Sequence, residues 1–428
     1  MVDIIITKSE HLAGEVSAPP SKAYTHRMLI AALLSNGTSK ISNPLVSDDT
    51  KATLRAVKAF GAETELLENC WTIRGVELLK APKNPINCGE SAATLRFMIP
   101  VAALAPEPTI FTLGSSLERR PIEPLLQSLK QLGTDSNLQL KEGSSLVRIH
   151  GGGIQGGKTS IRGDISSQFI SGLLFACPKA KEDTEIVVTT PLESRSYVQM
   201  TMDVLTKHGI SVFASNDSTK LKIPSNQNYN SYNHEVPGDF SSAAFLLAAA
   251  AVTSSKVKVK NLDPHTIQGD RAILDILENN GSKVRTDDKF VEVEGEQLNA
   301  VDLDAKDIPD LVPVCAVLAC YSKGITKIYN AKRLRYKESD RLGSLRAELK
   351  KMGAEIIAKE DSLIIRGPCT MQGTTVNPHN DHRIAMACAV AALEAIGETK
   401  IQNSECVNKS YPRFFDDLHL LGANVVGK

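Results

Sequence analysis

The sequence has no long apolar run and no leader-like start. Among its 428 residues there is no stretch of 18 consecutive apolar residues, whereas a membrane-spanning helix needs about 20. The first residues, MVDIIITKSEHLAG, carry charge early and lack the apolar core of a secretory signal peptide. We therefore expect a cytoplasmic protein without a membrane partner.

The sequence also lacks an excess of charge of either sign. Lysine plus arginine and aspartate plus glutamate each total 49, so the formal net charge is zero. A general nucleic-acid binder usually carries a basic excess, and the single tryptophan offers little surface on which bases could stack. We expect no nucleic-acid partner.

Paired metal-binding motifs are missing as well. The eight cysteines contain no CxxC pair, and several stand in apolar runs such as VCAVLAC. The nine histidines form neither an HxxxH nor an HExxH pattern. The sequence therefore predicts reduced thiols and no metal site.

The chain does contain one pattern six times, in which small polar residues lead into an Ala- and Leu-rich run. The successive anchor residues of the six copies are Ser21, Ser91, Ser166, Ser241, Pro309 and Asp381, so the gaps are 70, 75, 75, 68 and 72 residues. Ser, Asp and Pro are typical of helix starts, and a run that is apolar on all sides predicts a buried helix.

Short strand-like pieces and more polar helical stretches alternate with these runs. EIVVTT and SKVKVKNL are examples of the first kind, and SDDTKATLRAVKAFGAE and ESDRLGSLRAELKKMGAE of the second. The alternation predicts an α/β fold, and the length suffices for two domains of three units each. The polar segment 225–235 is the expected join.

Cations gather near the expected helix starts, where the helix dipole already favours anions. They are Lys22, Arg27, Arg119, Arg120, Lys337, Arg341, Arg383 and Lys409. This pattern predicts a small substrate with several phosphate or carboxylate groups. Asp310, Glu338 and His382 are the acid–base candidates, although Asp310 also fits a helix cap and Glu338 an ion pair.

The motifs around these charges resemble those of one enzyme family. PPSKAYTHR, DISSQF, RYKESDR, NDHR and NKSYPRFF occur in the order found in 5-enolpyruvylshikimate-3-phosphate synthases, over nearly the whole chain. The resemblance implies two domains, each of three βαβαββ repeats in an inside-out, barrel-like arrangement, with a cleft lined by helix N-termini. The expected domains are 18–235, mainly the shikimate 3-phosphate site, and 1–17 plus 236–428, with the phosphoenolpyruvate site and the catalytic carboxylates.

The family transfers the enolpyruvyl group of phosphoenolpyruvate to the 5-hydroxyl of shikimate 3-phosphate and releases phosphate. The resemblance therefore implies these two small molecules as partners, no metal or organic cofactor, and a monomer. Asp310 would take the hydroxyl proton, and Glu338 would give and remove the proton at carbon 3, with the help of Lys22.

The resemblance also implies a set of substrate contacts. Shikimate 3-phosphate would contact Lys22, Ala23, Arg27, Ser166, Ser167, Gln168, Ser194, Asp310 and Lys337, with Tyr197 nearby. Phosphoenolpyruvate would contact Lys22, Ala92, Arg120, Gln168, Arg341, Arg383 and Lys409.

The chain departs from the family pattern at three positions. Ala23 replaces a usual Ser, and losing that hydroxyl should weaken the acceptor contact by ~1–3 kcal/mol if a partner stays unpaired. Arg333 stands where many members have Asn. Ala92 stands where many have Gly, and its Cβ should exclude glyphosate, which is longer than phosphoenolpyruvate, so we expect glyphosate tolerance.

The segment CGESAATLR would place the start of its helix beside phosphoenolpyruvate. Gly89 would allow the turn, Glu90 and Ser91 are cap candidates, and Arg96 is expected to brace the helix rather than bind substrate.

Three alternatives remain at this point. A UDP-N-acetylglucosamine enolpyruvyl transferase shares the fold but carries a reactive Cys in a loop that reads LGSSLERRPI here. A non-catalytic, repeat-built binding protein and a family member that has lost its activity are the other two.

Overall fold

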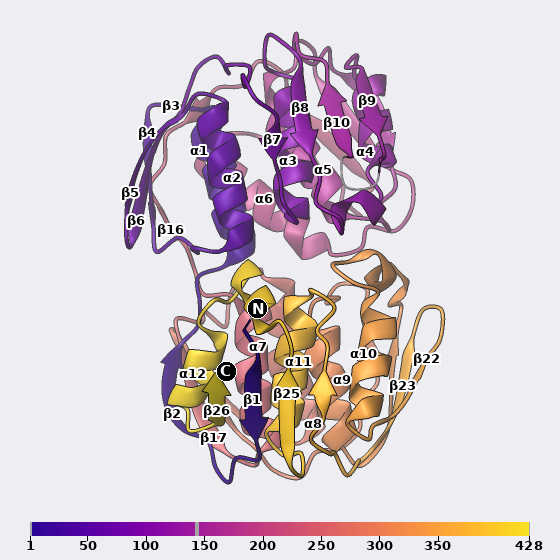
Figure 1. The fold of residues 1–428 in the computed structure, drawn as a ribbon. Helices are drawn as coiled ribbons and strands as arrows, with labels where there is room; N and C mark the ends of the chain where they lie inside the picture. Colours follow the sequence, from indigo (N-terminus) through magenta and orange to yellow (C-terminus); the bar gives the residue numbers. More distant parts are fainter. Residues whose placement is uncertain (1, 142–144, 428) are drawn as a thin grey trace. The chain divides into compact units, whose positions relative to one another are not determined.

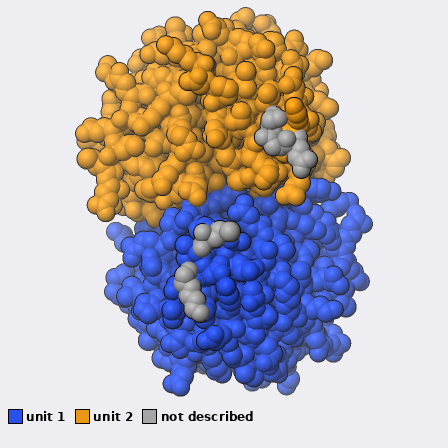
Figure 2. Space-filling model, viewed as in Figure 1, with its two compact units in different colours: residues 1–19, 237–428 blue, residues 20–236 orange. Residues whose placement is uncertain are grey.

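The computed structural model describes residues 2–141 and 145–427 and divides the chain into two compact units. Unit 1 comprises residues 1–19 and 237–428, and unit 2 comprises residues 20–236 (Figure 2). The boundaries expected from the sequence were 17/18 and 235/236. The chain leaves unit 1 after Pro19 and returns to it after Val236.

Within the described residues, each unit contains three four-stranded sheets of one pattern, in which the first two strands are parallel and the remaining pairs antiparallel (Figure 1). The sheets of unit 2 are β16 (His234–Glu235), β4 (Thr38–Ser42), β6 (Cys70–Arg74), β5 (Glu63–Leu67); β7 (Ile86–Asn87), β8 (Thr109–Thr112), β10 (Leu146–Ile149), β9 (Ser136–Gln139); and β11 (Gly157–Ile161), β12 (Thr184–Val188), β14 (Lys220–Ile223), β13 (Phe213–Ala214). The sheets of unit 1 are β2 (Ala13–Ser17), β17 (Lys256–Lys260), β19 (Phe290–Glu294), β18 (Lys283–Asp287); β20 (Leu303–Asp304), β21 (Gly324–Tyr329), β23 (Leu363–Gly367), β22 (Glu355–Ala358); and β24 (Thr375–Val376), β25 (Glu398–Ile401), β1 (Ile4–Thr7), β26 (Asn424–Gly427). The short strands β15 (Tyr229–Asn230) and β3 (Ser35–Asn36) pair in unit 2.

The helices fall into two classes that alternate along the chain. The buried helices are α1 (Lys22–Leu34), α3 (Ala92–Ala102), α5 (Ser167–Ala176), α7 (Phe240–Val252), α9 (Val312–Tyr321) and α11 (His382–Ala392). The more polar helices are α2 (Asp48–Ala59), α4 (Glu123–Gln131), α6 (Arg195–Lys207), α8 (Ile273–Asn280), α10 (Arg341–Lys351) and α12 (Phe414–Leu420). Short 3₁₀ turns are η1 (Leu117–Arg119), η2 (Cys177–Lys179), η3 (Gly269–Ala272), η4 (Lys332–Tyr336) and η5 (Ser404–Lys409). The two-domain α/β fold with three βαβαββ repeats per domain is therefore confirmed.

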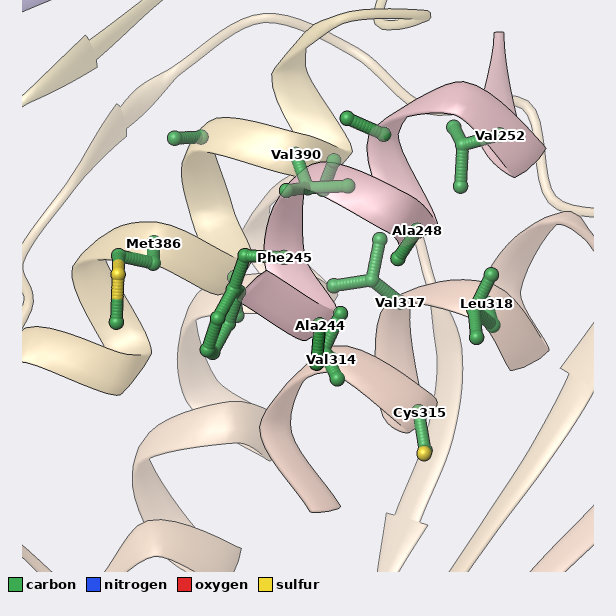
Figure 3. Packing of buried hydrophobic residues seen from close by; sticks show 14 of the residues in the cluster. Ala244, Phe245, Ala248, Val252, Val314, Cys315, Val317, Leu318, Met386 and Val390 are labelled. Carbon is green, nitrogen blue, oxygen red and sulfur yellow. The ribbon is translucent and has the colours of Figure 1, made fainter. Parts of the chain in front are cut away.

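The buried helices form the core of each unit. In unit 1, α7, α9 and α11 contact one another, and Figure 3 shows Phe245 and Ala248 of α7 beside Val317 of α9 and Val390 of α11. Burying each Val or Phe side chain contributes about 1.5–3 kcal/mol, which explains why these runs are apolar on every side. In unit 2, α5 lies so close to α3 that a Cβ at Gly172 would come within 2.4 Å of a backbone oxygen of α3.

The strands that lead into α1 and α7 lie in the opposite unit from those helices. Strand β2 precedes α1 in the chain but pairs with β17 in unit 1. Strand β16 precedes α7 but pairs with β4 in unit 2. The expected polar join at 225–235 is therefore no free linker, since Tyr229 is 1% exposed and donates its hydroxyl to the Phe175 carbonyl.

Four of the six anchors cap their helices as expected, and two do not. Ser21, Ser91, Ser166 and Asp381 are the N-caps of α1, α3, α5 and α11, and each accepts a backbone N–H. Asp239, two residues before the anchor Ser241, caps α7 instead. Helix α9 begins after Leu311 without a side-chain cap, and its proline is Pro313 rather than the anchor Pro309.

None of the helices in the described part of the chain is long and apolar enough to cross a membrane. Over the same residues, no group of three or more His, Cys, Asp or Glu side chains is placed to hold a metal ion. All eight cysteines are free thiols.

Candidate active site

Arg341 gathers three carboxylates in unit 1. It is the first residue of α10 and is 1% exposed. Its guanidinium donates to Asp310 Oδ1 at 2.7 Å, Glu338 Oε2 at 2.8 Å and Asp381 Oδ2 at 2.9 Å. These carboxylates outweigh the effect of burial and raise the pKa of Arg341. The start of α10 thereby joins the segments that precede α9 and α11.

Asp310 lies among three cations. Besides Arg341, the Arg383 guanidinium lies 3.4 Å from Asp310 Oδ2 and the Lys337 ammonium lies 3.5 Å from Oδ1. Burial alone would raise the pKa of Asp310, but Arg383, Lys337 and Arg341 hold it well below its ordinary value. Asp310 is therefore an ionised carboxylate that can accept a proton, inside a cluster of cations that attracts anions.

Lys337 follows η4 directly, and its side chain is 28% exposed, more than those of Arg341 and Arg383. Burial, together with the nearby charges of Arg341 and Arg333, lowers the pKa of Lys337 to about 8, while Asp310 opposes this shift. Arg333, the departure from the family pattern, is itself buried and donates to the Lys306 carbonyl at 2.5 Å. It thus acts on Lys337 through its charge.

Arg383 is held at the start of α11. Its N–H donates to the cap Asp381, and its guanidinium donates to the Ser241 carbonyl at 3.2 Å and the Asp310 carbonyl at 3.3 Å. Lys409, at the end of η5, is 7% exposed, and η5 packs against α11. His382 is buried, with Nδ1 3.9 Å from Asp381 Oδ1. The structure thus brings both Arg341 and Arg383 into contact with the Asp310 carboxylate.

In unit 2, Lys22 opens α1 and is held by an acid from the next helix. Its ammonium lies 3.0 Å from Asp49 Oδ2, and both side chains are largely buried. Ala23 follows in the first turn, and its carbonyl accepts from Arg27 at 2.8 Å. Asp49 was missed in the sequence because two acids after a Ser cap are what an ordinary helix start shows.

Arg27 is almost fully buried, and its partners lie inside unit 2. Its Nε donates to Thr201 Oγ1 at 2.9 Å and one terminal nitrogen donates to the Tyr197 carbonyl at 2.9 Å. The guanidinium also lies over the Phe97 ring at 5.1 Å. Burial lowers the pKa of Arg27 to about 10. In this structure Arg27 ties α1 to α6, so substrate contact by it stays a prediction.

Arg96 of α3 organises the start of α5. It donates to Ser166 Oγ at 3.3 Å, Gln168 Oε1 at 3.0 Å and the Pro121 carbonyl at 3.1 Å, and it stacks on the Phe169 ring. Arg96 is therefore the brace that the sequence suggested, and it braces two of the predicted substrate contacts.

Ser194 and Ser167 also stand at helix starts. Ser194 precedes α6 with φ of 53°, a left-handed conformation that is uncommon for Ser and typical of functional turns. Its carbonyl accepts from the Tyr197 N–H at 3.1 Å. Ser167 is the first residue of α5.

The segment around Ala92 differs from the expectation in one respect. Ser91 caps α3 and Ala92 is its first residue, but Glu90 is no cap. Glu90 accepts instead from the N–H of Ser116 at 3.1 Å and from the Ser116 hydroxyl. Ser116 Oγ in turn accepts from Arg120 at 3.4 Å, so Glu90 anchors the loop that carries Arg120.

Comparison with known proteins identifies the family of the chain. The family model for EPSP synthase (3-phosphoshikimate 1-carboxyvinyltransferase) matches residues 6–418. Curated 3-phosphoshikimate 1-carboxyvinyltransferases are similar over almost the whole chain. The one from Methanocaldococcus jannaschii is 42% identical over 426 residues, 99% of each protein, and the one from Methanocella arvoryzae is 45% identical over 423 residues, 98% of this chain and 99% of that protein.

A solved structure gives the same result for the fold. EPSP synthase from Acinetobacter baumannii superposes with a TM-score of 0.83 at 25% identity and covers all of both chains. The chain therefore belongs to the EPSP synthase (3-phosphoshikimate 1-carboxyvinyltransferase) family.

Proposed function

We propose that this protein transfers the enolpyruvyl group of phosphoenolpyruvate to the 5-hydroxyl of shikimate 3-phosphate and releases phosphate, a step in aromatic amino-acid biosynthesis. The observation that carries the proposal is the environment of Asp310, an ionised carboxylate within 3.5 Å of Arg341, Arg383 and Lys337. Both substrates carry phosphate and carboxylate groups, which such cations bind.

The carboxylates of Asp310 and Glu338 carry out different proton transfers of the reaction. Asp310 accepts the proton of the 5-hydroxyl as its oxygen bonds to carbon 2 of phosphoenolpyruvate. Glu338 protonates carbon 3 and later removes a proton from it, when the tetrahedral intermediate expels phosphate. Arg341 contacts both carboxylates, at 2.7 Å and 2.8 Å, so the two proton carriers are fixed relative to each other.

Different sets of residues bind the two substrates. We assign phosphoenolpyruvate to Arg341, Arg383 and Lys409 in unit 1 and to Arg120 and Ala92 in unit 2. We assign shikimate 3-phosphate to Lys337 in unit 1 and to Ala23, Arg27, Ser166, Ser167 and Ser194 in unit 2, with Lys22 and Gln168 contacting both substrates. Orienting two anions in this way supplies about 7–11 kcal/mol of the barrier reduction in favourable cases.

The test is phosphate release by the purified protein with both substrates. Asp310→Asn should lower kcat about 10²–10⁴-fold, as the loss of a general base does. Asp288→Asn, at an exposed hairpin residue of unit 1, is the matched control and should leave kcat unchanged. Release that occurs only when UDP-N-acetylglucosamine replaces shikimate 3-phosphate would contradict the proposal.

We further propose that the protein acts as a monomer in the cytoplasm. Light scattering coupled to size exclusion should give a mass near the 46.2 kDa of one chain.

A further inference from the structure

Asp270 is a buried carboxylic acid for which the proposed reaction has no use. It lies in η3 of unit 1 and is 1% exposed. Its Oδ2 is hydrogen-bonded to the hydroxyl of Ser241, in the first turn of α7. Its Oδ1 is buried and meets no hydrogen-bond donor among the described residues. Because an ionised oxygen without a donor is costly to bury, this environment fits the neutral acid.

The segment that carries Asp270 also forms hydrogen bonds to the start of α7 at a second point. The Gln268 side chain accepts from the Phe240 N–H at 3.1 Å and donates to the Gly238 carbonyl at 2.8 Å. Gly238 cannot be larger here, since a Cβ would lie 1.7 Å from the Asn261 carbonyl oxygen. The first turn of α7 is thus fixed by Gln268 through its backbone and by Asp270 through the Ser241 side chain.

The start of α7 in turn fixes Arg383. The Ser241 carbonyl accepts from the Arg383 guanidinium at 3.2 Å, beside the contacts of that guanidinium to Asp310. All of these groups belong to unit 1. A continuous path of hydrogen bonds therefore runs from Asp270 through Ser241 to a cation that the proposed function assigns to phosphoenolpyruvate.

We propose that Asp270 is a positioning residue for Arg383: as a neutral acid it holds Ser241, and the Ser241 carbonyl holds the guanidinium in place for the phosphoenolpyruvate anion. The proposal rests on the proposed function for the identity of the anion. Asp270 itself touches no substrate in this scheme.

Charge explains why the neutral form matters. Burial, together with the charges of Asp310 and Asp239, raises the pKa of Asp270 to about 7, against the opposing effects of Arg383 and the Ser241 hydroxyl. The thiol of Cys315 on α9 is close enough that the Asp270 charge adds to the effect of burial in raising its pKa. On the side of α8, Arg271 is paired with Asp275 at 3.8 Å. When Asp270 ionises, its charge competes with the donor anion for Arg383.

A double-mutant cycle tests the path. Asp270→Ala and Ser241→Ala should each raise the KM for phosphoenolpyruvate about tenfold, with the acceptor KM changed less than about twofold, because each removes the same hydrogen bond. The double variant should be no worse than either single one. Additive effects, or equal effects on both substrates, would overturn the proposal. Asp275→Asn, at an exposed position of α8, is the matched control.

The pH dependence of kcat/KM for phosphoenolpyruvate is a second measurement. A purely structural role of Asp270 would not change it. In the parent, kcat/KM for phosphoenolpyruvate should fall as pH rises through about 7, because Asp270 becomes charged. Asp270→Asn keeps an acceptor for the Ser241 hydroxyl but cannot ionise, so it should retain activity and lose this decline. A decline that persists in Asp270→Asn would refute the assignment.

Failure of this proposal is distinguishable from failure of the proposed function. If the parent releases phosphate and Asp270→Ala leaves the KM for phosphoenolpyruvate unchanged, only the positioning role is wrong. If the parent releases no phosphate, the proposed function is wrong. The positioning role is then judged by the rise in melting temperature with phosphoenolpyruvate alone, which Asp270→Ala and Ser241→Ala should diminish equally; an undiminished rise would overturn it.

Discussion

Lys337 should make acceptor binding sensitive to mildly alkaline pH. An ordinary lysine has a pKa of about 10.4 and stays charged throughout the working range of most enzymes. Burial lowers the pKa of Lys337 to about 8, so its ammonium is present below that pH and is lost above it. Since Lys337 is assigned to shikimate 3-phosphate, each lost proton removes a contact to that anion.

The magnitude follows from the titration itself. With a pKa of about 8, roughly nine-tenths of Lys337 is charged at pH 7 and roughly one-tenth at pH 9. The kcat/KM for shikimate 3-phosphate, which reports the enzyme before this acceptor binds, should therefore fall about tenfold between these two pH values. The decline in kcat should begin at higher pH, because the bound anion favours the ammonium form.

The assay is initial-rate phosphate release at varied shikimate 3-phosphate and saturating phosphoenolpyruvate, from pH 6.5 to pH 9.5. Lys337→Arg keeps the charge over this whole range, since an arginine pKa lies above about 12. Its absolute kcat/KM will differ from the parent, but its profile should be flat between pH 7 and pH 9. If kcat/KM of Lys337→Arg falls over the same pH range and as steeply as that of the parent, the reasoning is refuted.

Three further predictions concern other parts of the chain. Arg96→Leu removes the donor to Ser166 and Gln168 and should raise the KM for shikimate 3-phosphate at least about tenfold. The control variant Arg55→Leu, on the exposed face of α2, should leave this KM unchanged. Glyphosate inhibition of the parent should be weaker than that of Ala92→Gly, and equal inhibition constants would reject the steric explanation. Cys369, whose pKa is lowered to about 6 chiefly by a hydrogen bond from Cys320, should react with iodoacetamide first at pH 7, and Cys369→Ser should lose that fast phase.

The sequence predicts those parts of the fold that depend on local signals. Capping residues such as Ser21 and Ser91 lie directly before apolar runs, so the starts of α1 and α3 are visible without any knowledge of the partners. The start of α7 was misplaced because Asp239 and Ser241 are both good caps, and only the backbone geometry decides between them.

The residues themselves could not predict that β2 and β16 each pair in the opposite unit from the helix that follows them. The five residues of β2 look like any short strand, and their pairing with β17 depends on a segment more than 240 positions away. The two residues of β16 give no periodic signal at all. The family resemblance implied that the N-terminal strand returns to the second domain, but not that β16 occupies the equivalent place in unit 2.

The same limit applies to the site. Cationic motifs predict Lys22, Arg341 and Arg383 as site residues, because clustered charge near helix starts is unusual. Asp49, which pairs with Lys22, and Asp270, which is linked to Arg383 through Ser241, were missed, since an acid at a helix start is common and usually exposed. Their burial distinguishes these two acids from the exposed acids that are usual at helix starts, since Asp270 is 1% and Asp49 is 5% exposed.

The contacts of Arg341 bear on how the base becomes effective. A carboxylate whose pKa is held well below its ordinary value is a weak base, and Asp310 is in that condition while Arg383, Lys337 and Arg341 surround it. An anion that binds Arg341 and Arg383 competes for the same N–H donors and offsets their positive charge. The pKa of Asp310 then moves back towards its ordinary value, because the charges that lowered it are partly neutralised. Under the proposed roles of Asp310 as the base and of Arg341 and Arg383 as ligands of phosphoenolpyruvate, donor binding and base strength are therefore coupled, and the hydroxyl proton is best removed when phosphoenolpyruvate is already in place.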